Sequence, residues 1–85
     1  MKANYKNYVD VEKWLDENEI EYIKLNPHQY RIMGDVALID LWPARMTVHI
    51  VATEGVDTNE YFRLDYYFNP KQLKNVLDGK HRFDK

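Results

Sequence analysis

The most strand-like part of the chain is residues 30–51, which read YRIMGDVALIDLWPARMTVHIV. Within it, residues 36–42 form an almost continuous apolar run that only Asp40 interrupts and that Trp42 and Pro43 close. A run of this kind is typical of a strand that is covered on one face and partly on the other. We therefore expect this strand at the centre of a sheet, with the rest of the chain pairing with it or covering it.

Other segments alternate between apolar and polar residues, and alternation with a period of two predicts strands that have one buried face. The predicted strands besides the central one are residues 20–25, 28–33, 46–52 and 61–68. Gly34-Asp35 should make a tight hairpin turn in which the glycine supplies a positive φ. The longest irregular segment is residues 53–60, which we expect to form an exposed acidic loop.

Two segments have the apolar spacing i, i+3, i+4 that places side chains on one face of a helix. In the first, Asp10 is the expected N-cap and Asn18-Glu19 the expected end. Its apolar face would consist of Val11, Trp14 and Leu15. Residues 1–9 would then precede the helix and dock loosely.

The second helix should begin at Asn69-Pro70, because asparagine caps helices and proline is favoured in the first turn, and it should stop at Gly79. Its apolar face would consist of Leu73, Val76 and Leu77. The sequence thus predicts one α+β domain over residues 1–85: an N-terminal helix, an antiparallel meander of four to five strands and a C-terminal helix. Because each helix has a single apolar stripe, both should cover one face of the sheet.

The composition is that of a folded protein, with 45% hydrophobic and 31% charged residues. The chain has no cysteine, which excludes disulfides, thiolate metal sites and cysteine nucleophiles. The N-terminal residues lack the apolar core of a secretory signal, and no apolar run reaches the length of a membrane span. We therefore expect a cytoplasmic protein that does not associate with a membrane.

The net charge of −2 disfavours nucleic-acid binding, because a binder usually needs a basic patch to release counterions from phosphates. The acidic residues gather near the end of the first helix and in the predicted loop. Those predicted to form a protein-binding surface are Glu17, Glu19, Glu21, Glu54, Asp57 and Glu60. Such a surface could mimic DNA and occupy the DNA-binding face of a partner protein.

Seven tyrosines and two tryptophans are many for 85 residues. On the predicted last strand, Tyr61, Arg63 and Tyr67 share the side opposite the core. If the helices cover only one face of the sheet, these residues and Trp42 would leave the other face aromatic and exposed, which usually marks association. The sequence therefore predicts a second protein-binding surface there, and a homodimer.

One pair of residues could support catalysis. Asp40 could approach His49 across the hairpin after the central strand, and a carboxylate beside an imidazole is used in acid–base chemistry. Asp40 could equally pair with an arginine such as Arg31 or Arg63.

Other chemistry has less support in the sequence. A metallonuclease could use Asp35, Asp40 and Glu54, but no lysine occurs between Lys24 and Lys71. The three histidines lack the spacing of zinc ligands, and the chain has neither a glycine-rich phosphate loop nor any serine. We expect no enzymatic activity, no metal and no cofactor.

A nucleic-acid-binding module is the alternative function, because helix, strands and helix is also the order of double-stranded RNA-binding domains. Those domains use a basic cluster near the start of the second helix. The corresponding basic residues here are Lys71, Lys74, Lys80 and Arg82. Asp78 lies among them, and the long predicted loop is acidic rather than basic.

In two motifs, Tyr30-Arg31-Ile32 and Asp40-Leu41-Trp42-Pro43, the chain resembles small accessory proteins of tailed bacteriophages. In those proteins a YRI strand leads through a hairpin to a D-x-W-P or D-x-Y-P turn, and the likeness covers residues 10–52. A turn similar to Thr-Thr-Gly-Lys often follows the proline there, whereas this chain has Ala44-Arg45-Met46. The resemblance implies an early, host-takeover protein that binds and inhibits or modulates a host protein in the host cytoplasm, and it implies no catalytic residues.

Overall fold

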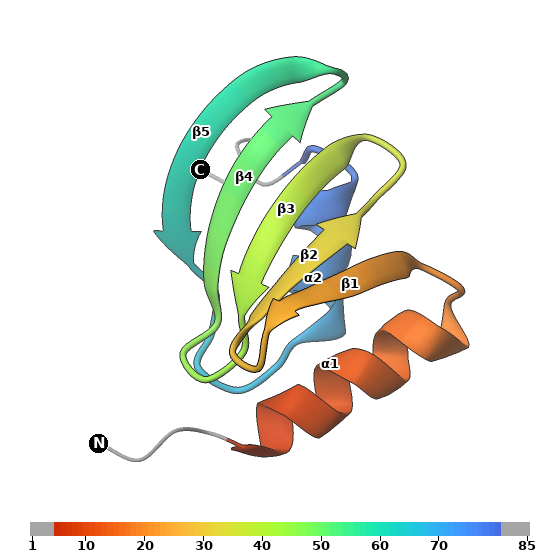
Figure 1. The fold of residues 1–85 in the computed structure, drawn as a ribbon, viewed down its shortest axis with the longest axis vertical. Coiled ribbons are helices and arrows are strands. Elements are labelled where there is room, and N and C mark those ends of the chain that lie inside the picture. Colours follow the sequence, from red (N-terminus) through yellow and green to blue (C-terminus); the bar gives the residue numbers. More distant parts are fainter. Residues whose placement is uncertain (1–4, 81–85) are drawn as a thin grey trace.

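The structure, a computed structural model, describes residues 5–80 of the chain. In that part, one helix, five strands and a second helix follow one another, which confirms the predicted α+β class (Figure 1). The elements are α1 (Tyr5–Glu17), β1 (Glu21–Asn26), β2 (Gln29–Met33), β3 (Ala37–Trp42), β4 (Thr47–Thr53), β5 (Val56–Arg63) and α2 (Pro70–Leu77). No helix within residues 5–80 is long and apolar enough to cross a membrane.

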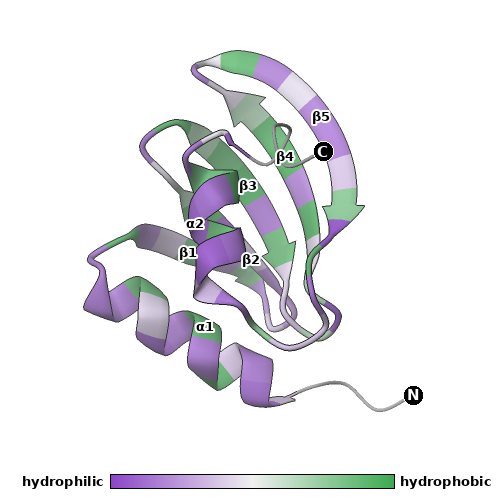
Figure 2. Cartoon of the chain, turned by 180° about the vertical axis from the view of Figure 1, so that it is seen from behind, coloured by the Kyte–Doolittle hydropathy of each residue, from purple (hydrophilic) through white to green (hydrophobic). Residues whose placement is uncertain are grey.

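The strands form one sheet in the order β1-β2-β3-β4-β5, and each neighbouring pair is antiparallel. The sheet is therefore the predicted meander, and the apolar run after Asp35 supplies its central strand β3. Figure 1 shows α2 behind the sheet, and the reverse view in Figure 2 shows it across the near face, with α1 along the lower edge beside β1.

A single hydrophobic core joins both helices to one face of the sheet. The buried helix residues in this core are Val11, Leu15, Leu73, Val76 and Leu77. The buried strand residues are Tyr30, Ile32, Ala37, Ile39, Leu41, Val48 and Ile50. The strand residues alternate along β2, β3 and β4, so their side chains point to the same face. This confirms that both helices cover one face and leave the other uncovered.

Helix α1 starts earlier than the sequence indicated. Asp10 lies inside the helix rather than at its N-cap, and it pairs with Lys6 at 3.2 Å, one turn before it. The prediction was wrong because Asp10 was taken as the cap, whereas Tyr8 lies three residues before Val11 on the same helix face and packs against the core. The first turns also contain one buried polar side chain, Asn7.

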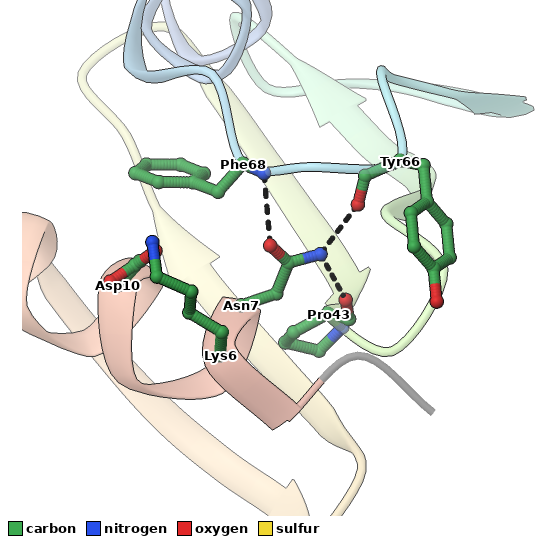
Figure 3. A network of polar contacts seen from close by, with 6 residues as sticks. All are labelled: Lys6, Asn7, Asp10, Pro43, Tyr66 and Phe68. Carbon is green, nitrogen blue, oxygen red and sulfur yellow. Dashed lines mark hydrogen bonds and ion pairs between the residues drawn. The ribbon is translucent and has the colours of Figure 1, made fainter. Parts of the chain in front are cut away.

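Asn7 joins α1 to the two loops at one end of the sheet. Its amide nitrogen donates to the carbonyl oxygens of Pro43 at 3.0 Å and Tyr66 at 2.6 Å. Its side-chain oxygen accepts a hydrogen bond from the backbone N–H of Phe68 at 2.9 Å (Figure 3). The segment after β5 is therefore held against α1 and not against β4.

Strand β5 begins and ends earlier than predicted. Residues 53–60 are not a loop: β4 extends to Thr53, β5 begins at Val56, and only Glu54-Gly55 turn the chain. These two residues have φ values of 52° and 78°, and positive φ at both positions defines a type I′ turn, which suits the twist of a hairpin. The loop prediction was wrong because the start of β5 is polar, which an edge strand tolerates.

The other end of β5 also differs from the prediction, because the strand stops at Arg63 rather than continuing to residue 68. The backbone N–H of Leu64 still bonds to Met46 at 2.9 Å, and beyond it the contacts with Asn7 direct the chain away from the sheet. Tyr67 is therefore not on β5.

The structural role of Gly34 differs from the predicted one. The described glycines with positive φ are Gly55 and Gly79, so Gly34 does not need that freedom. A Cβ atom at Gly34 would lie 2.9 Å from the Ala37 carbonyl oxygen and 3.0 Å from the Leu77 side chain. The missing side chain lets α2 pack closely against the turn between β2 and β3.

Both helices end in the same backbone motif. Helix α2 begins at its predicted cap, where the Asn69 side chain accepts a hydrogen bond from the Lys71 N–H at 3.1 Å. It ends at Leu77, and Gly79, two residues beyond, has a φ of 74°. Helix α1 ends before Asn18-Glu19, as predicted, but there the left-handed position is Glu19, with φ of 56°. A non-glycine residue at such a position is strained.

Candidate functional site

The register of the strands arranges the side chains of the uncovered face in rows that run across the sheet. The row through its centre, which we call the polar row, consists of Ile23, Arg31, Asp40, His49 and Tyr61. Each member is the pairing partner of the next, so the row spans all five strands. Directly paired residues have Cβ atoms about 5 Å apart, close enough for their side chains to touch.

Asp40, at the centre of the polar row, is only 3% exposed. Arg31 donates two hydrogen bonds to its carboxylate, from Nε to Oδ1 at 2.8 Å and from a terminal nitrogen to Oδ2 at 3.0 Å. Gln29 donates a third bond, at 3.1 Å. The hydrogen bond to Asp40 raises the pKa of Arg31, burial opposes the rise, and the carboxylate charge adds to it. The buried charge is thus fully compensated within the face.

His49 and Tyr61 form a stacked aromatic pair beside this ion pair. Their ring centroids are 4.0 Å apart and their planes differ by 4°. The Nε2 atom of His49 lies 2.8 Å from Oδ1 of Asn59, a residue with φ of 53° at a shift in the pairing of β4 and β5. This irregularity brings Asn59 to the histidine, so the ring is fixed on two sides.

Two further rows flank the polar row. The first, which we call the acid-ended row, consists of Glu21, Met33, Leu38, Ala52 and Asp57. The second, which we call the arginine-ended row, consists of Trp42, Thr47 and Arg63. The face is therefore acidic towards one end of its strands and basic towards the other, with apolar side chains between the charges.

Large apolar side chains on this face remain accessible. Ile23 and Tyr61, on the two edge strands, are 50% and 65% exposed. Between them, three side chains are half-buried: Met33, Leu38 and Trp42. An uncovered face of this composition is typical of surfaces that bind another protein.

The acidic residues predicted to form one surface lie at opposite edges of the sheet. Glu17, Glu19 and Glu21 are exposed at the end of α1 and the start of β1. Glu54 and Asp57 are exposed at the hairpin between β4 and β5, on the opposite edge. Four strand spacings of about 4.8 Å separate the two groups, so roughly 19 Å lies between the edge strands.

Two predicted binding residues lie away from both groups. Glu60 pairs with Ile50, which belongs to the core, so its side chain points to the covered face and is half-buried. Tyr67 lies between β5 and α2, is 71% exposed and places its ring edge-on against Tyr66 with centroids 5.0 Å apart. Of the predicted aromatic surface, the structure brings together Trp42, Tyr61 and Arg63.

The candidate catalytic pair has the expected register but other bonding partners. Asp40 and His49 are direct pairing partners, yet the carboxylate accepts from Arg31 and Gln29, and the imidazole contacts Asn59. The sequence had offered Arg31 as a partner for Asp40, and the structure confirms that contact. Within residues 5–80, no group of three or more histidine, aspartate or glutamate residues could hold a metal ion.

The basic residues of the alternative function lie on and after α2. Lys74 pairs with Asp78 at 2.9 Å, which neutralises part of its charge. Lys71 and Lys80 are exposed, and Arg82 lies outside the described residues. Lys74 and Asp78 also line an open groove of about 460 Å³ between the C-terminal ends of the two helices, whose other charged residues are Glu19, Glu21 and Asp35.

Two residues that organise the uncovered face could not be predicted from the sequence. Gln29 and Asn59 fix the carboxylate and the imidazole, but neither belongs to a motif, and Asn59 lay in the predicted loop. The signal that was present is the alternation of β2 and β4, which put Arg31 and His49 on the polar side of their strands, and the interruption of the apolar run of β3 by Asp40.

Comparison of the chain with protein-family models, curated proteins and solved structures found no match.

Proposed function

We propose that this chain is a non-enzymatic protein-binding domain whose binding surface is the uncovered face of the sheet. The observation that carries the proposal is the exposure of Tyr61 and Ile23 on a face whose charged centre, Arg31 with Asp40, is already internally paired. A partner that covers this face buries apolar surface without leaving that carboxylate unpaired. Tyrosine, tryptophan and arginine are also the residue types that contribute most to binding energy at interfaces.

The side chains of the uncovered face are held in place by their own contacts, which supports the same function. Arg31 is held by two hydrogen bonds, and His49 is held between Asn59 and Tyr61. Side chains that are fixed before binding lose less conformational entropy when a partner covers them. The face is thus organised in advance for association.

The resemblance to bacteriophage accessory proteins extends the proposal to the kind of partner, a host protein that this domain inhibits or modulates. Glu21 and Asp57 stand at the two edges of the face and would attract a basic partner, including a DNA-binding protein. Because the acidic groups are far apart, Glu21 and Asp57 would act at the rim of the interface, and the acidic residues would not form one continuous surface that mimics DNA.

Two tyrosines provide a matched test, because Tyr61 is on the face and Tyr67 is off it, with exposures of 65% and 71%. Wild-type protein, Tyr61→Asp and Tyr67→Asp would each be used to capture partners from nuclease-treated bacterial lysate, with circular dichroism to verify folding. We expect a stoichiometric protein that wild type and Tyr67→Asp retain and that Tyr61→Asp loses.

Two results would contradict this proposal. Equal capture by both variants would place the binding surface elsewhere. A nucleic acid that elutes when nuclease is omitted, and that is lost in Lys71→Glu, would favour the alternative module of the basic helix.

A further inference from the structure

We propose that a second copy of this chain occupies the uncovered face, with a two-fold axis that runs across the strands along the polar row. The inference rests on the proposed function, since it names an occupant of the same surface. It is carried by the position of Asp57, which faces an arginine in one arrangement and a glutamate in the other.

Strand β5 has opposite charges near its two ends. Asp57 pairs with Ala52 and Arg63 pairs with Thr47, so both charged side chains belong to the uncovered face, and both are exposed. A two-fold axis that runs across the strands places each strand over its own copy with the ends exchanged. Asp57 then faces Arg63 of the second copy, and symmetry produces this contact twice.

The other face-to-face arrangement has its two-fold axis parallel to the strands. It would place β5 over β1 of the second copy, because the strand order is reversed. Asp57 would then face Glu21, which belongs to the same acid-ended row. Two contacts between like charges disfavour this arrangement.

The remaining rows are compatible with the first arrangement. Exchange of the strand ends brings Trp42 of one copy over Leu38 of the other, both on β3, which joins two half-buried apolar side chains. The polar row faces its own copy, where Asp40 is already neutralised by Arg31. No uncompensated carboxylate therefore meets its symmetry mate at the centre.

The size of the face sets the strength of the dimer. Five strands about 4.8 Å apart and six residues long, at roughly 3.3 Å per residue, cover on the order of 450 Å² in each copy. About 900 Å² in total is below the roughly 1,200 Å² that stable specific interfaces bury, so the dimer should be weak and should dissociate on dilution, which leaves the face accessible to another partner.

Sedimentation equilibrium over a wide range of protein concentration tests the arrangement by charge reversal. We expect Asp57→Arg and Arg63→Asp each to weaken dimerisation about ten-fold or more, because each converts two attractive contacts into repulsive ones. The double variant Asp57→Arg/Arg63→Asp should restore it. Glu17→Arg, which makes the same charge change on α1 away from the face, should have little effect.

Fluorescence gives an independent readout, because Trp42 lies in the interface and Trp14 lies on the helix side. In Trp14→Phe, the emission of Trp42 should shift on dilution, and in Trp42→Phe the emission of Trp14 should not. A monomer at all concentrations, or a double variant no better than the single variants, would overturn the inference. If Tyr61→Asp still loses a captured protein in that case, the proposed function stands without the dimer.

Discussion

At the scale of single residues, the Asn7 side chain connects α1 to two loops by hydrogen bonds. It is 1% exposed and bonds three backbone groups that come from two separate loops. A buried amide without partners would be costly, whereas one that is fully bonded fixes the groups around it. Asn7 thereby determines where α1 begins and where the chain leaves β5.

We expect Asn7→Ala to reduce the free energy of unfolding by about 2–3 kcal/mol, because it removes three hydrogen bonds to buried and partly buried backbone groups of Pro43, Tyr66 and Phe68. Urea denaturation followed by circular dichroism measures the change. Asn18→Ala is the matched control, since the Asn18 side chain is exposed and bonds only to Trp14 of its own helix. A loss for Asn7→Ala no larger than that of the control would show that the network contributes little.

At the scale of elements, the two helix ends show how much a local rule can predict. Asn69, Pro70 and Gly79 are the residue types that α2 needs at its ends, so the sequence identified both ends. Helix α1 uses the same terminal motif, in which the N–H of Ile20 bonds to Leu15 at 2.9 Å, but with glutamate at the left-handed position.

Glu19→Gly should therefore stabilise the protein by up to about 1 kcal/mol, because glycine adopts positive φ without the strain of a side chain. Chemical denaturation provides the measurement. The control is Lys13→Gly, at an exposed position inside α1, which should destabilise by about 1 kcal/mol because glycine disfavours the helix interior. Destabilisation by both substitutions would mean that the Glu19 side chain makes a stabilising contact that outweighs its strain.

At the scale of the whole molecule, one core connects elements from both ends of the chain. A domain of this length buries only about 60% of the surface of its unfolded chain, so its free energy of unfolding should be small. Residues of α1, the three inner strands and α2 belong to the same buried cluster. The domain should therefore unfold as a unit.

The fluorescence of the two tryptophans can test this cooperative unfolding, because they lie on opposite faces of the sheet. Trp14 packs edge-on against Phe68 on the helix side, with ring centroids 6.0 Å apart, and Trp42 lies on the uncovered face. At protein concentrations below dimerisation, Trp14→Phe and Trp42→Phe should each show one fluorescence transition in urea that coincides with the circular dichroism of the same variant. A separate, earlier transition for Trp14 would instead show that α1 detaches before the sheet unfolds.

The sequence alone determined the types and order of the elements, the central strand β3, both ends of α2 and the polar side of each inner strand. These follow from local physics: hydrophobic periodicity, capping chemistry and the alternation of side chains along a strand. The first turns of α1, the limits of β5 and the use of Gly34 depended on the tertiary structure. Each is decided by a contact between residues far apart in the chain, such as Asn7 with Phe68 or Gly34 with Leu77. The placement of Asp57 and Arg63 in the two rows that flank the polar row is of the same kind, because the register across five strands is set by pairing and not by any one segment.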